Sequence, residues 1–296
     1  MDRFEDMAIF VAVAESQGFA AAARRLNLSP PSVTRAVASL ESRIGTLLFT
    51  RNTRSVRLTE SGQHFFADCR RILAEIAEAG DAAAGEDAVP RGNLTVTAPV
   101  LFGEMIITPI VVAFLADHAQ MRIRLQLLDR VVNMIDEGMD VAIRIAPVTD
   151  PALLAIPVGH VRRVVCASPA LLEQHGIPAH PDALKDFRLV DASSVGDWQF
   201  QDQGKRFTVP VQSALQVNSN RAAIRAACAG WGITRVISYQ IANELATNVL
   251  KTVLSEFELP PAPVHVVYPE ARRGSAKLRR FVDYCVDRLR ANPALN

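Results

Sequence analysis

The sequence predicts an all-α N-terminal domain, a long linker helix and a C-terminal α/β domain. Three observations support this division. Residues 1–58 hold short segments with the apolar spacing of helices and end in an arginine-rich stretch. Residues 59–87 continue a helical spacing over several turns. From Asn93 onward, segments that alternate like strands are separated by segments of helical length, which indicates βαβ units around a parallel sheet.

The bulk composition is that of a globular protein, with 49% hydrophobic and 21% charged residues. The formal net charge is only +1, so any affinity for nucleic acid must come from a local cluster of basic side chains. The N-terminus lacks the basic and apolar regions of a signal peptide, and no apolar run reaches the ~18 residues of a membrane span. We therefore expect a cytoplasmic protein.

Three short helices are expected before residue 45. The first should bury one face, made of Phe4, Met7, Phe10, Val11 and Ala14, and end at Gly18. The second, from Phe19 to Leu26, is rich in alanine, which favours a helix and lets a neighbour pack closely. After a turn at Asn27, Ser29 suits an N-cap and Pro30 suits the first position of a third helix.

The third helix, from about Pro30 to Ile44, has two different faces. Its buried side is expected to consist of Val33, Val37, Leu40 and Ile44. The opposite face carries Pro31, Arg35, Ala38, Ser39 and Ser42, with Ser32 and Thr34 at its flanks. A small, polar face near the start of a helix is what entry into the major groove of DNA requires.

An arginine-rich hairpin follows this helix. Two short strands around Asn52–Thr53 would hold Arg51, Arg54 and Arg57 where they can reach phosphates or a narrow minor groove. Together these features predict a winged helix-turn-helix over residues 1–58. From the pattern alone, a small helical domain with a solvated arginine patch is the alternative interpretation.

The exact residue string carries a resemblance that favours the DNA-binding interpretation. It comprises Ala21 to Ser29, Pro31, Val33, Thr34–Arg35, Leu40–Glu41, Leu48 to Arg51 and Val56 to Gly62. These residues are similar to the LysR-type transcriptional regulators, which implies binding to double-stranded promoter DNA. The candidate DNA-binding residues are Ser29, Pro30, Ser32, Thr34, Arg35, Ser39, Arg51, Asn52, Thr53 and Arg54. The family usually has Gln where this chain has Pro30, so a contact by which relatives often read DNA is changed here.

A heptad seam follows Thr59, which can cap a helix. It consists of Phe65, Cys69, Ile72, Ile76, Ala79 and Ala83. Such a seam could pack on its own domain. The resemblance implies instead that this linker helix pairs antiparallel with a second subunit, giving a homodimer with two DNA-binding heads and allowing a homotetramer.

The C-terminal half, residues 88–296, continues the resemblance more loosely. It runs through Asn93 to Pro99, Phe102–Gly103, Glu137 to Arg144, Ala167 to Pro169 and Ala229 to Ile233. These segments are similar to the effector-binding domain of the family, which looks like a two-lobed periplasmic binding protein. Lobe I is expected over 93–161 and 268–296, and lobe II over 162–267. Expected strands are 94–97, 122–127 and 141–145, and expected helices are 105–116, 131–137, 221–230 and 275–290.

An unidentified small-molecule effector is expected between the lobes, where strand ends and helix N-termini converge. A helix beginning near Val100 or Leu101 could hold an anion on its free N–H groups. The resemblance implies Thr97, Pro99, Val100, Leu101 and Asp129 from lobe I, and Ser193, Trp198, Asn218 and Ile237 from lobe II. Relatives often have a carboxylate-binding Ser near Pro99, which proline cannot replace. For each residue the alternative is ordinary packing, above all for Trp198.

Enzyme chemistry has no support in the sequence. No nucleophile elbow, zinc-protease motif, phosphate loop or dinucleotide fingerprint occurs, and the six histidines lack metal-ligand spacing. We expect no catalytic residue, cofactor or metal. RNA polymerase is a candidate partner. Two alternatives stay open, a regulator with a vestigial effector pocket and a two-lobed small-molecule binding protein or enzyme.

The four cysteines are expected to be buried thiols, with a Cys166–Cys228 redox pair as the alternative.

Overall fold

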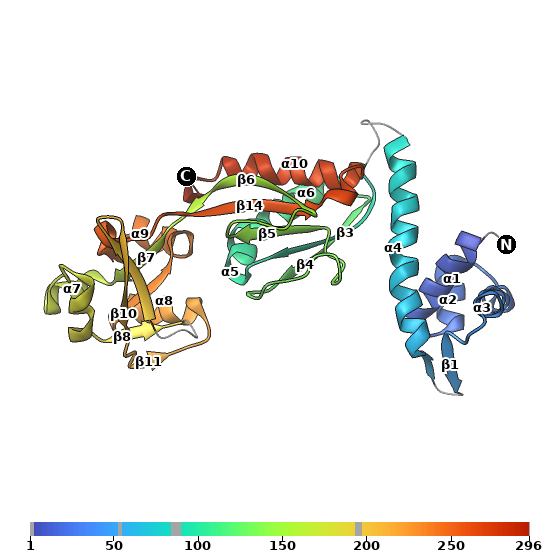
Figure 1. The fold of residues 1–296 in the computed structure, drawn as a ribbon, viewed down its shortest axis with the longest axis horizontal. Coiled ribbons are helices and arrows are strands. Elements are labelled where there is room, and N and C mark those ends of the chain that lie inside the picture. The colour runs from blue at the N-terminus through green and yellow to red at the C-terminus, as the bar shows by residue number, and fades with distance from the viewer. Residues whose placement is uncertain (1–2, 53–54, 84–89, 193–196, 296) are drawn as a thin grey trace. The chain divides into compact units, whose positions relative to one another are not determined.

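The computed structural model describes residues 3–52, 55–83, 90–192 and 197–295 (Figure 1). The chain divides into two compact units. One is Met1–Ala88 with Gly274–Ala276, and the other is Val89–Arg273 with Lys277–Asn296.

The N-terminal unit begins with three helices, α1 (Arg3–Ser16), α2 (Phe19–Leu26) and α3 (Pro30–Ile44). Helix α1 buries Met7 and Phe10 as expected, together with Ile9, Ala12 and Val13. The prediction that Phe4 belongs to this buried face is wrong. Phe4 lies in the first turn, with 44% of its surface exposed, because the neighbouring elements cover the helix only from Asp6 onward.

Local sequence signals account for where α2 and α3 end. Asn27 ends α2 in the left-handed conformation, at a φ of 55°, which asparagine tolerates better than most residues. Ser29 caps α3, and Gly45 ends it at a φ of 78°. The expected hairpin follows, with β1 (Phe49–Asn52) antiparallel to β2 (Ser55–Leu58).

Helix α4 (Glu60–Ala83) starts at the expected cap and packs its first turns on the N-terminal core. The hydroxyl of Thr59 accepts a hydrogen bond from the Gly62 N–H at 2.9 Å and donates one to the Leu47 carbonyl at 2.8 Å. Cys69 of α4 is buried, and Phe65 packs against Phe10 with ring centroids 5.5 Å apart. The core of this unit therefore joins α1, the hairpin and the start of α4.

Lobe I is built on a five-stranded sheet of order β4-β3-β5-β14-β6 (Figure 1). Its strands are β3 (Gly92–Ala98), β4 (Met121–Leu127), β5 (Val141–Ile145), β6 (Leu153–Val161) and β14 (Ala262–Pro269). Its helical segments are α5 (Val100–Phe102), the π-helical η1 (Gly103–Ile107), α6 (Thr108–Asp117), η5 (Glu270–Arg272), α10 (Ala276–Arg290) and η6 (Pro293–Leu295). The expected apolar face of α10, including Phe281 and Cys285, lies in the same core as Val96 of β3.

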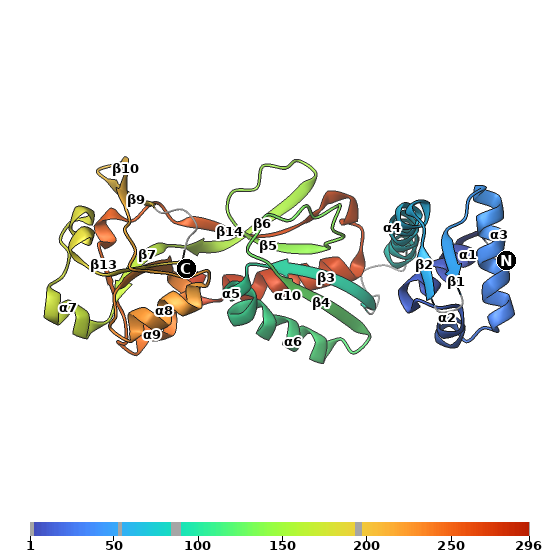
Figure 2. The same cartoon turned by 90° about the horizontal axis from the view of Figure 1, so that it is seen from below.

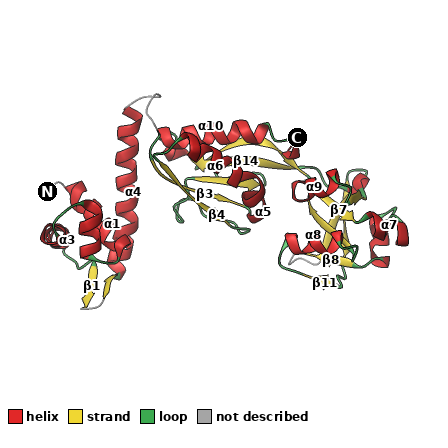
Figure 3. Cartoon of the chain, turned by 180° about the vertical axis from the view of Figure 1, so that it is seen from behind, coloured by secondary structure: helices red, strands yellow, loops and turns green. Residues whose placement is uncertain are grey.

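Lobe II is built on a second five-stranded sheet, of order β11-β8-β12-β7-β13. Strands β7 and β13 of this sheet are labelled in Figure 2. Its strands are β7 (Arg163–Ala167), β8 (Leu189–Asp191), β11 (Leu215–Gln216), β12 (Ile233–Ile237) and β13 (Lys251–Val253). A separate hairpin comprises β9 (Asp197–Asp202) and β10 (Lys205–Pro210). The helical segments are α7 (Pro169–His175), η2 (Pro181–Asp186), α8 (Asn220–Cys228), η3 (Ser238–Ile241), α9 (Ala242–Ala246) and η4 (Ser255–Phe257) (Figure 3).

Two strands connect the lobes. Strand β6 leads from lobe I into β7 of lobe II, and β14 returns, paired with β6 along its whole length from Ala262 to Pro269. The return to lobe I therefore comes earlier than the expected boundary at residue 268. Because β14 also pairs with β5, it belongs to the lobe I sheet from its first residue.

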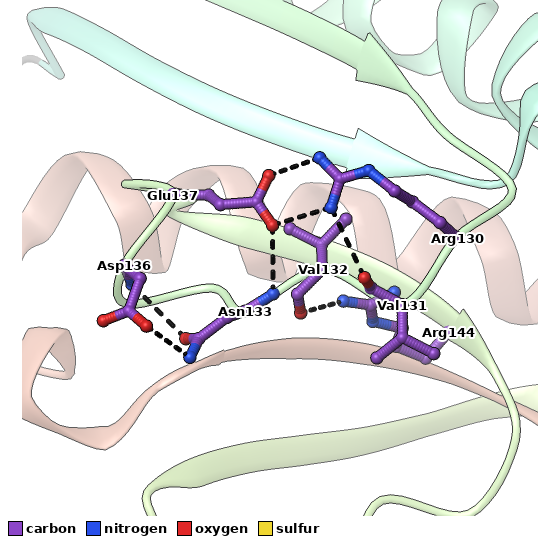
Figure 4. A network of polar contacts seen from close by, with 7 residues as sticks. All are labelled: Arg130, Val131, Val132, Asn133, Asp136, Glu137 and Arg144. Atoms are coloured by element: carbon purple, nitrogen blue, oxygen red, sulfur yellow. Dashed lines mark hydrogen bonds and ion pairs between the residues drawn. The ribbon is translucent and has the colours of Figure 1, made fainter.

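The helix predicted over residues 131–137 does not form, and a hydrogen-bonded turn takes its place (Figure 4). The amide oxygen of Asn133 accepts hydrogen bonds from the Ile135 and Asp136 N–H groups at 3.2 and 3.3 Å. The carboxylate of Glu137 is held by the guanidinium of Arg130 and accepts from the Asn133 N–H. These side chains offer the backbone alternatives to helical hydrogen bonds, which is the usual reason that Asn disfavours helices.

The expectation that no segment is long and apolar enough to span a membrane is wrong for Val100–Asp117. The helix expected over 105–116 begins at Val100 and, with its π-helical turn, runs for 18 residues. Its buried residues, Phe102, Ile107 and Phe114 among them, pack in the lobe I core. Val112 and Met105 of the same segment are exposed, so packing in the core accounts for only part of its apolar composition.

Candidate nucleic-acid interface and effector site

The start of α3 presents the expected small, polar surface. Among the candidates on this helix, Ser29, Pro30, Thr34, Arg35 and Ser39 are exposed, and Ser32 is half-buried. The Ser29 hydroxyl accepts from the Ser32 N–H at 3.3 Å and lies 2.8 Å from the Ser32 hydroxyl. Thr34 donates to the Pro30 carbonyl at 3.0 Å, and Arg35 donates to the Pro31 carbonyl at 3.4 Å. The first turns of α3 thus hold several hydrogen-bonding groups at the surface.

The opposite side of α3 is buried, with one exception at its end. Val33, Val37 and Leu40 are buried as expected. The prediction for Ile44 is wrong, because 40% of its surface is exposed in the last residue before the Gly45 cap. Glu41 is buried instead. Its carboxylate accepts hydrogen bonds from the Leu48 and Phe49 N–H groups at 2.9 and 3.2 Å, which holds the start of the hairpin against α3.

Only some of the hairpin arginines belong to the described structure. The backbone of Arg51 pairs in register with Val56, and that of Asn52 pairs with Ser55, but their side chains are not among those described. Thr53 and Arg54 lie outside the described residues. Arg57 is exposed and pairs with Thr50. The hairpin backbone is therefore as expected, and the contacts of its arginines stay a prediction.

A part-buried ion pair fixes α3 on α1. The Arg43 guanidinium lies 2.6 Å from the carboxylate of Asp6, which is only 1% exposed. A buried carboxylate needs such a partner because loss of hydration is costly. Arg43 is exposed but is accordingly paired with Asp6 of its own domain, in contrast to Arg35.

In lobe I, the expected effector residues surround the N-terminus of α5. Thr97 and Leu101 are buried, and Pro99 and Val100 are half-buried. The Val100 N–H donates a hydrogen bond to the Asp129 carboxylate at 2.9 Å. The expectation that this N–H is free to hold an anionic ligand is therefore wrong. An internal carboxylate already complements the positive end of the helix, where an external anion would have bound.

In lobe II, the expected residues have different roles. Trp198 is only 1% exposed and packs in the core beneath the β9–β10 hairpin, where its indole N–H donates to the Asp191 carboxylate at 3.3 Å. Asn218 is exposed, and Ile237 packs against the core of lobe I. Ser193 lies outside the described residues. For Trp198 the packing alternative fits the structure.

Contacts between the lobes bring several of these residues together. The rings of Phe102 in lobe I and Tyr239 in lobe II meet edge to face with centroids 5.1 Å apart. Burial raises the pKa of Tyr239 to about 12, and the negative charge of Asp129 acts in the same direction. The carboxylate of Glu104 on η1 forms an ion pair with the guanidinium of Arg221 on α8. Aromatic packing and one ion pair thus join the lobes beside Asp129.

Arg235 was not among the residues predicted from the sequence. This half-buried residue of β12 stacks its guanidinium over Trp198, with Cζ 5.2 Å from the ring centroid, and donates to the Gln199 carbonyl at 3.0 Å. One signal was available: Arg235 is the single charge in the apolar strand Ile233–Ile237. A charged residue in such a strand calls for a partner or a function.

The cysteines form no obvious reactive pair. Cys69, Cys166 and Cys285 are buried, and Cys228 is half-buried. Burial raises the pKa of Cys166 to about 12, and the neighbouring Cys228 and Glu244 act in the same direction. Burial and Glu244 also raise the pKa of Cys228. Because the thiolate is the reactive form, these surroundings disfavour redox chemistry. Within the described ranges, His, Cys, Asp and Glu form no cluster suited to a metal ion.

The fold and site define a class of protein: a winged helix-turn-helix joined through a long helix to a two-lobed ligand-binding domain is a transcription regulator. Residues 4–63 match the bacterial regulatory helix-turn-helix proteins of the lysR family, and residues 87–290 match the LysR substrate binding domain. The chain therefore belongs to the LysR-type transcriptional regulators.

Individual relatives agree with this assignment. The chain is 30% identical over 300 residues to the probable HTH-type transcriptional regulator LtrA of Klebsiella pneumoniae, covering 98% of this chain and 95% of that protein. It is 30% identical over 286 residues to the transcriptional regulator DmlR of Escherichia coli, covering 94% and 92%. The solved structure of CrgA, a LysR-type regulator from Neisseria meningitidis, is 27% identical with a TM-score of 0.62, covering 96% and 98%. The full-length Vibrio cholerae virulence activator AphB shares the fold, at 24% identity and a TM-score of 0.62, covering 97% and 99%.

Proposed function

We propose that this regulator reads its promoter DNA through the first turns of α3 and anchors itself with the arginine hairpin. This proposal rests mainly on one observation: Ser29, Thr34, Arg35 and Ser39 are exposed on a helix whose other side is buried. Helices of this kind enter the major groove with their N-terminal residues at base edges. Arg35, with its planar fork of donors, is the residue suited to guanine, and the hydroxyls are suited to bases or phosphates.

We further propose that α4 pairs with α4 of a second copy to form the dimer. The seam residues Phe65 and Cys69 are engaged in their own domain, whereas Ile76 further along has 42% of its surface exposed. An apolar seam that continues past the domain it packs on is suited to a partner helix. Light scattering on the purified chain should give at least twice the monomer mass of 32.3 kDa. A tetramer would show as a further doubling, and a monomer at micromolar concentration would contradict this proposal.

The two-lobed domain is proposed to bind a small molecule where its lobes meet, and to pass the change to the DNA-binding heads. The contacts of Phe102 with Tyr239 and of Glu104 with Arg221 support it, because a ligand between the lobes must alter them. We propose that the protein acts in the cytoplasm through DNA and, where it activates, through RNA polymerase, rather than by catalysis. A regulator whose pocket binds nothing remains the competing hypothesis.

The direct experiment is a footprint of the full chain on the DNA upstream of its own gene. We expect a protected region with roughly palindromic half-sites, as two heads on one dimer require. Deleting residues 1–58 should abolish protection and leave a folded ligand-binding domain. Protection that survives this deletion would contradict the proposed interface.

A further inference from the structure

The carboxyl ends of the parallel strands of lobe II gather a small set of charged side chains. Strands β8, β11 and β12 run parallel, with Thr234 in register with Val190 and Gln216 in register with Asp191. Asp191 ends β8, and Arg235 is the next residue of β12 after Thr234, so the two occupy the same level of the sheet. Arg163, at the start of β7, is in register with Ile237. Ligands of α/β proteins bind at such carboxyl edges.

The guanidinium of Arg235 is positioned by neutral groups. It lies over Trp198 and also near Phe200, with Cζ 6.0 Å from that ring centroid, and donates to the Gln199 carbonyl. In the part of the chain that the structure describes, this guanidinium makes no other hydrogen bond and no ion pair. The rings and the carbonyl hold the cation in place and leave several of its five donors available.

The charge around Arg235 is not balanced. Two cations, Arg235 and Arg163, act on each other, and Asp191 is the one carboxylate that acts on Arg235 among the described residues. Burial, together with the positive charge of Arg163, lowers the pKa of the Arg235 guanidinium to about 10. A cation held out of water without a close counter-charge is costly, and an incoming anion would relieve that cost.

Lobe I offers no competing anion site at the expected position. The Val100 N–H is already bonded to the carboxylate of Asp129, whose negative charge would repel an anionic ligand there. An anionic ligand would therefore meet a more favourable charge at the lobe II edge, on Arg235, than at the helix N-terminus of lobe I.

We propose that Arg235 is the anchor of the effector site and that the effector carries a carboxylate, which pairs with the guanidinium beside Asp191 and Trp198. The inference rests on the proposed response to a small molecule and names its chemical class, a small organic acid. Two arginines against one carboxylate leave a single net positive charge, which suits a monocarboxylate better than a phosphate dianion. The planar carboxylate also matches the arginine fork.

The test measures thermal unfolding of the full-length chain with acetate, benzoate, inorganic phosphate or the neutral benzamide, all at constant ionic strength. Because Arg235 recognises the charged group itself, acetate and benzoate should raise the unfolding midpoint saturably at millimolar concentration, and benzamide should not. Arg235→Gln should weaken the apparent affinity for benzoate at least tenfold. Arg206→Gln, which removes an exposed arginine of β10 in the same lobe, should leave it unchanged.

Equal responses to benzoate and benzamide by the wild-type chain would overturn the proposal, and this comparison does not depend on any variant folding. Equal responses of Arg235→Gln and the wild type to benzoate would also overturn the proposal. A wild-type chain that responds to phosphate but to neither carboxylate would overturn it as well. Operator binding is measured in parallel. A chain that binds its operator but neither carboxylate contradicts this inference only, whereas a chain that binds no DNA contradicts the proposed function.

Discussion

The carboxylate of Glu41 accepts the backbone N–H of Leu48 at 2.9 Å, and this bond ties the end of the recognition helix to the start of the hairpin. The same oxygen accepts the Phe49 N–H at 3.2 Å. Both backbone donors are buried, so their satisfaction depends on this one side chain. The relative placement of helix and hairpin, and with it the DNA-binding surface, rests on a residue that touches no DNA in the proposed interface.

Replacing Glu41 with alanine should therefore destabilise the N-terminal unit by about 1–3 kcal/mol, because buried N–H groups would be left without an acceptor. Glu41→Gln keeps an acceptor oxygen and should cost less. Chemical denaturation followed by circular dichroism measures both variants. Equal stability of Glu41→Ala and the wild type would show that the bond contributes nothing.

Gly62 permits a close approach of α4 to the hairpin. A Cβ at this position would collide with the Leu48 carbonyl oxygen, whereas one at Gly80 of the same helix would meet nothing within 4 Å. Gly62→Ala should cost about 1–3 kcal/mol through overpacking. Gly80→Ala is the matched control and should stabilise the helix by about 0.5–1 kcal/mol. If both substitutions have the same effect in thermal unfolding, the approach at Leu48 is not tight in solution.

The hairpin arginines are expected to bind phosphate. Arg51→Ala or Arg54→Ala should weaken binding to operator and unrelated DNA alike. Each should lower the slope of log K against log salt by about one unit for every phosphate that the variant no longer neutralises. The readout is fluorescence anisotropy at several salt concentrations. An unchanged slope would mean that these side chains do not touch the backbone of the DNA.

The thiols should respond to pH in a defined direction. Burial raises the pKa of Cys69 to about 11 and those of Cys166 and Cys285 to about 12, from an ordinary value of 9.0. The folded state thus keeps protons that the unfolded state loses, so this contribution to stability is complete below pH 9 and declines as pH rises toward 12.

Native labelling with a thiol reagent should modify half-buried Cys228 first. Rapid labelling of Cys166 at pH 8 would contradict its burial.

The parts of the fold that follow from neighbouring residues were predictable from the sequence, and those that depend on distant partners were not. Ser29, Asn27 and Thr59 act within a few residues of their own position, so their capping and turn roles follow from local rules. Asn248 likewise adopts the left-handed conformation, at a φ of 56°, which asparagine tolerates better than most residues. The helix expected at 131–137 does not form because the side chains of Asn133 and Glu137 accept hydrogen bonds from backbone N–H groups. The spacing of apolar residues does not reveal this competition.

The candidate effector site was predicted less completely for the same reason. Resemblance pointed to Asp129, but its bond to Val100 brings together residues 29 positions apart. Arg235 went unnoticed because its neighbours Trp198 and Gln199 come from a separate hairpin. Nothing in the strand itself indicates that an aromatic ring will lie beneath the guanidinium.

Whether the start of α3 reads DNA can be measured with Arg35→Ala in anisotropy titrations against the operator and an unrelated duplex. We expect a loss of about 1–3 kcal/mol on the operator and little change on unrelated DNA, so that specificity falls. Arg206→Ala, in lobe II, serves as the control and should bind as the wild type does. An Arg35→Ala protein with unchanged affinity and unchanged discrimination between the two duplexes would show that Arg35 does not read the operator.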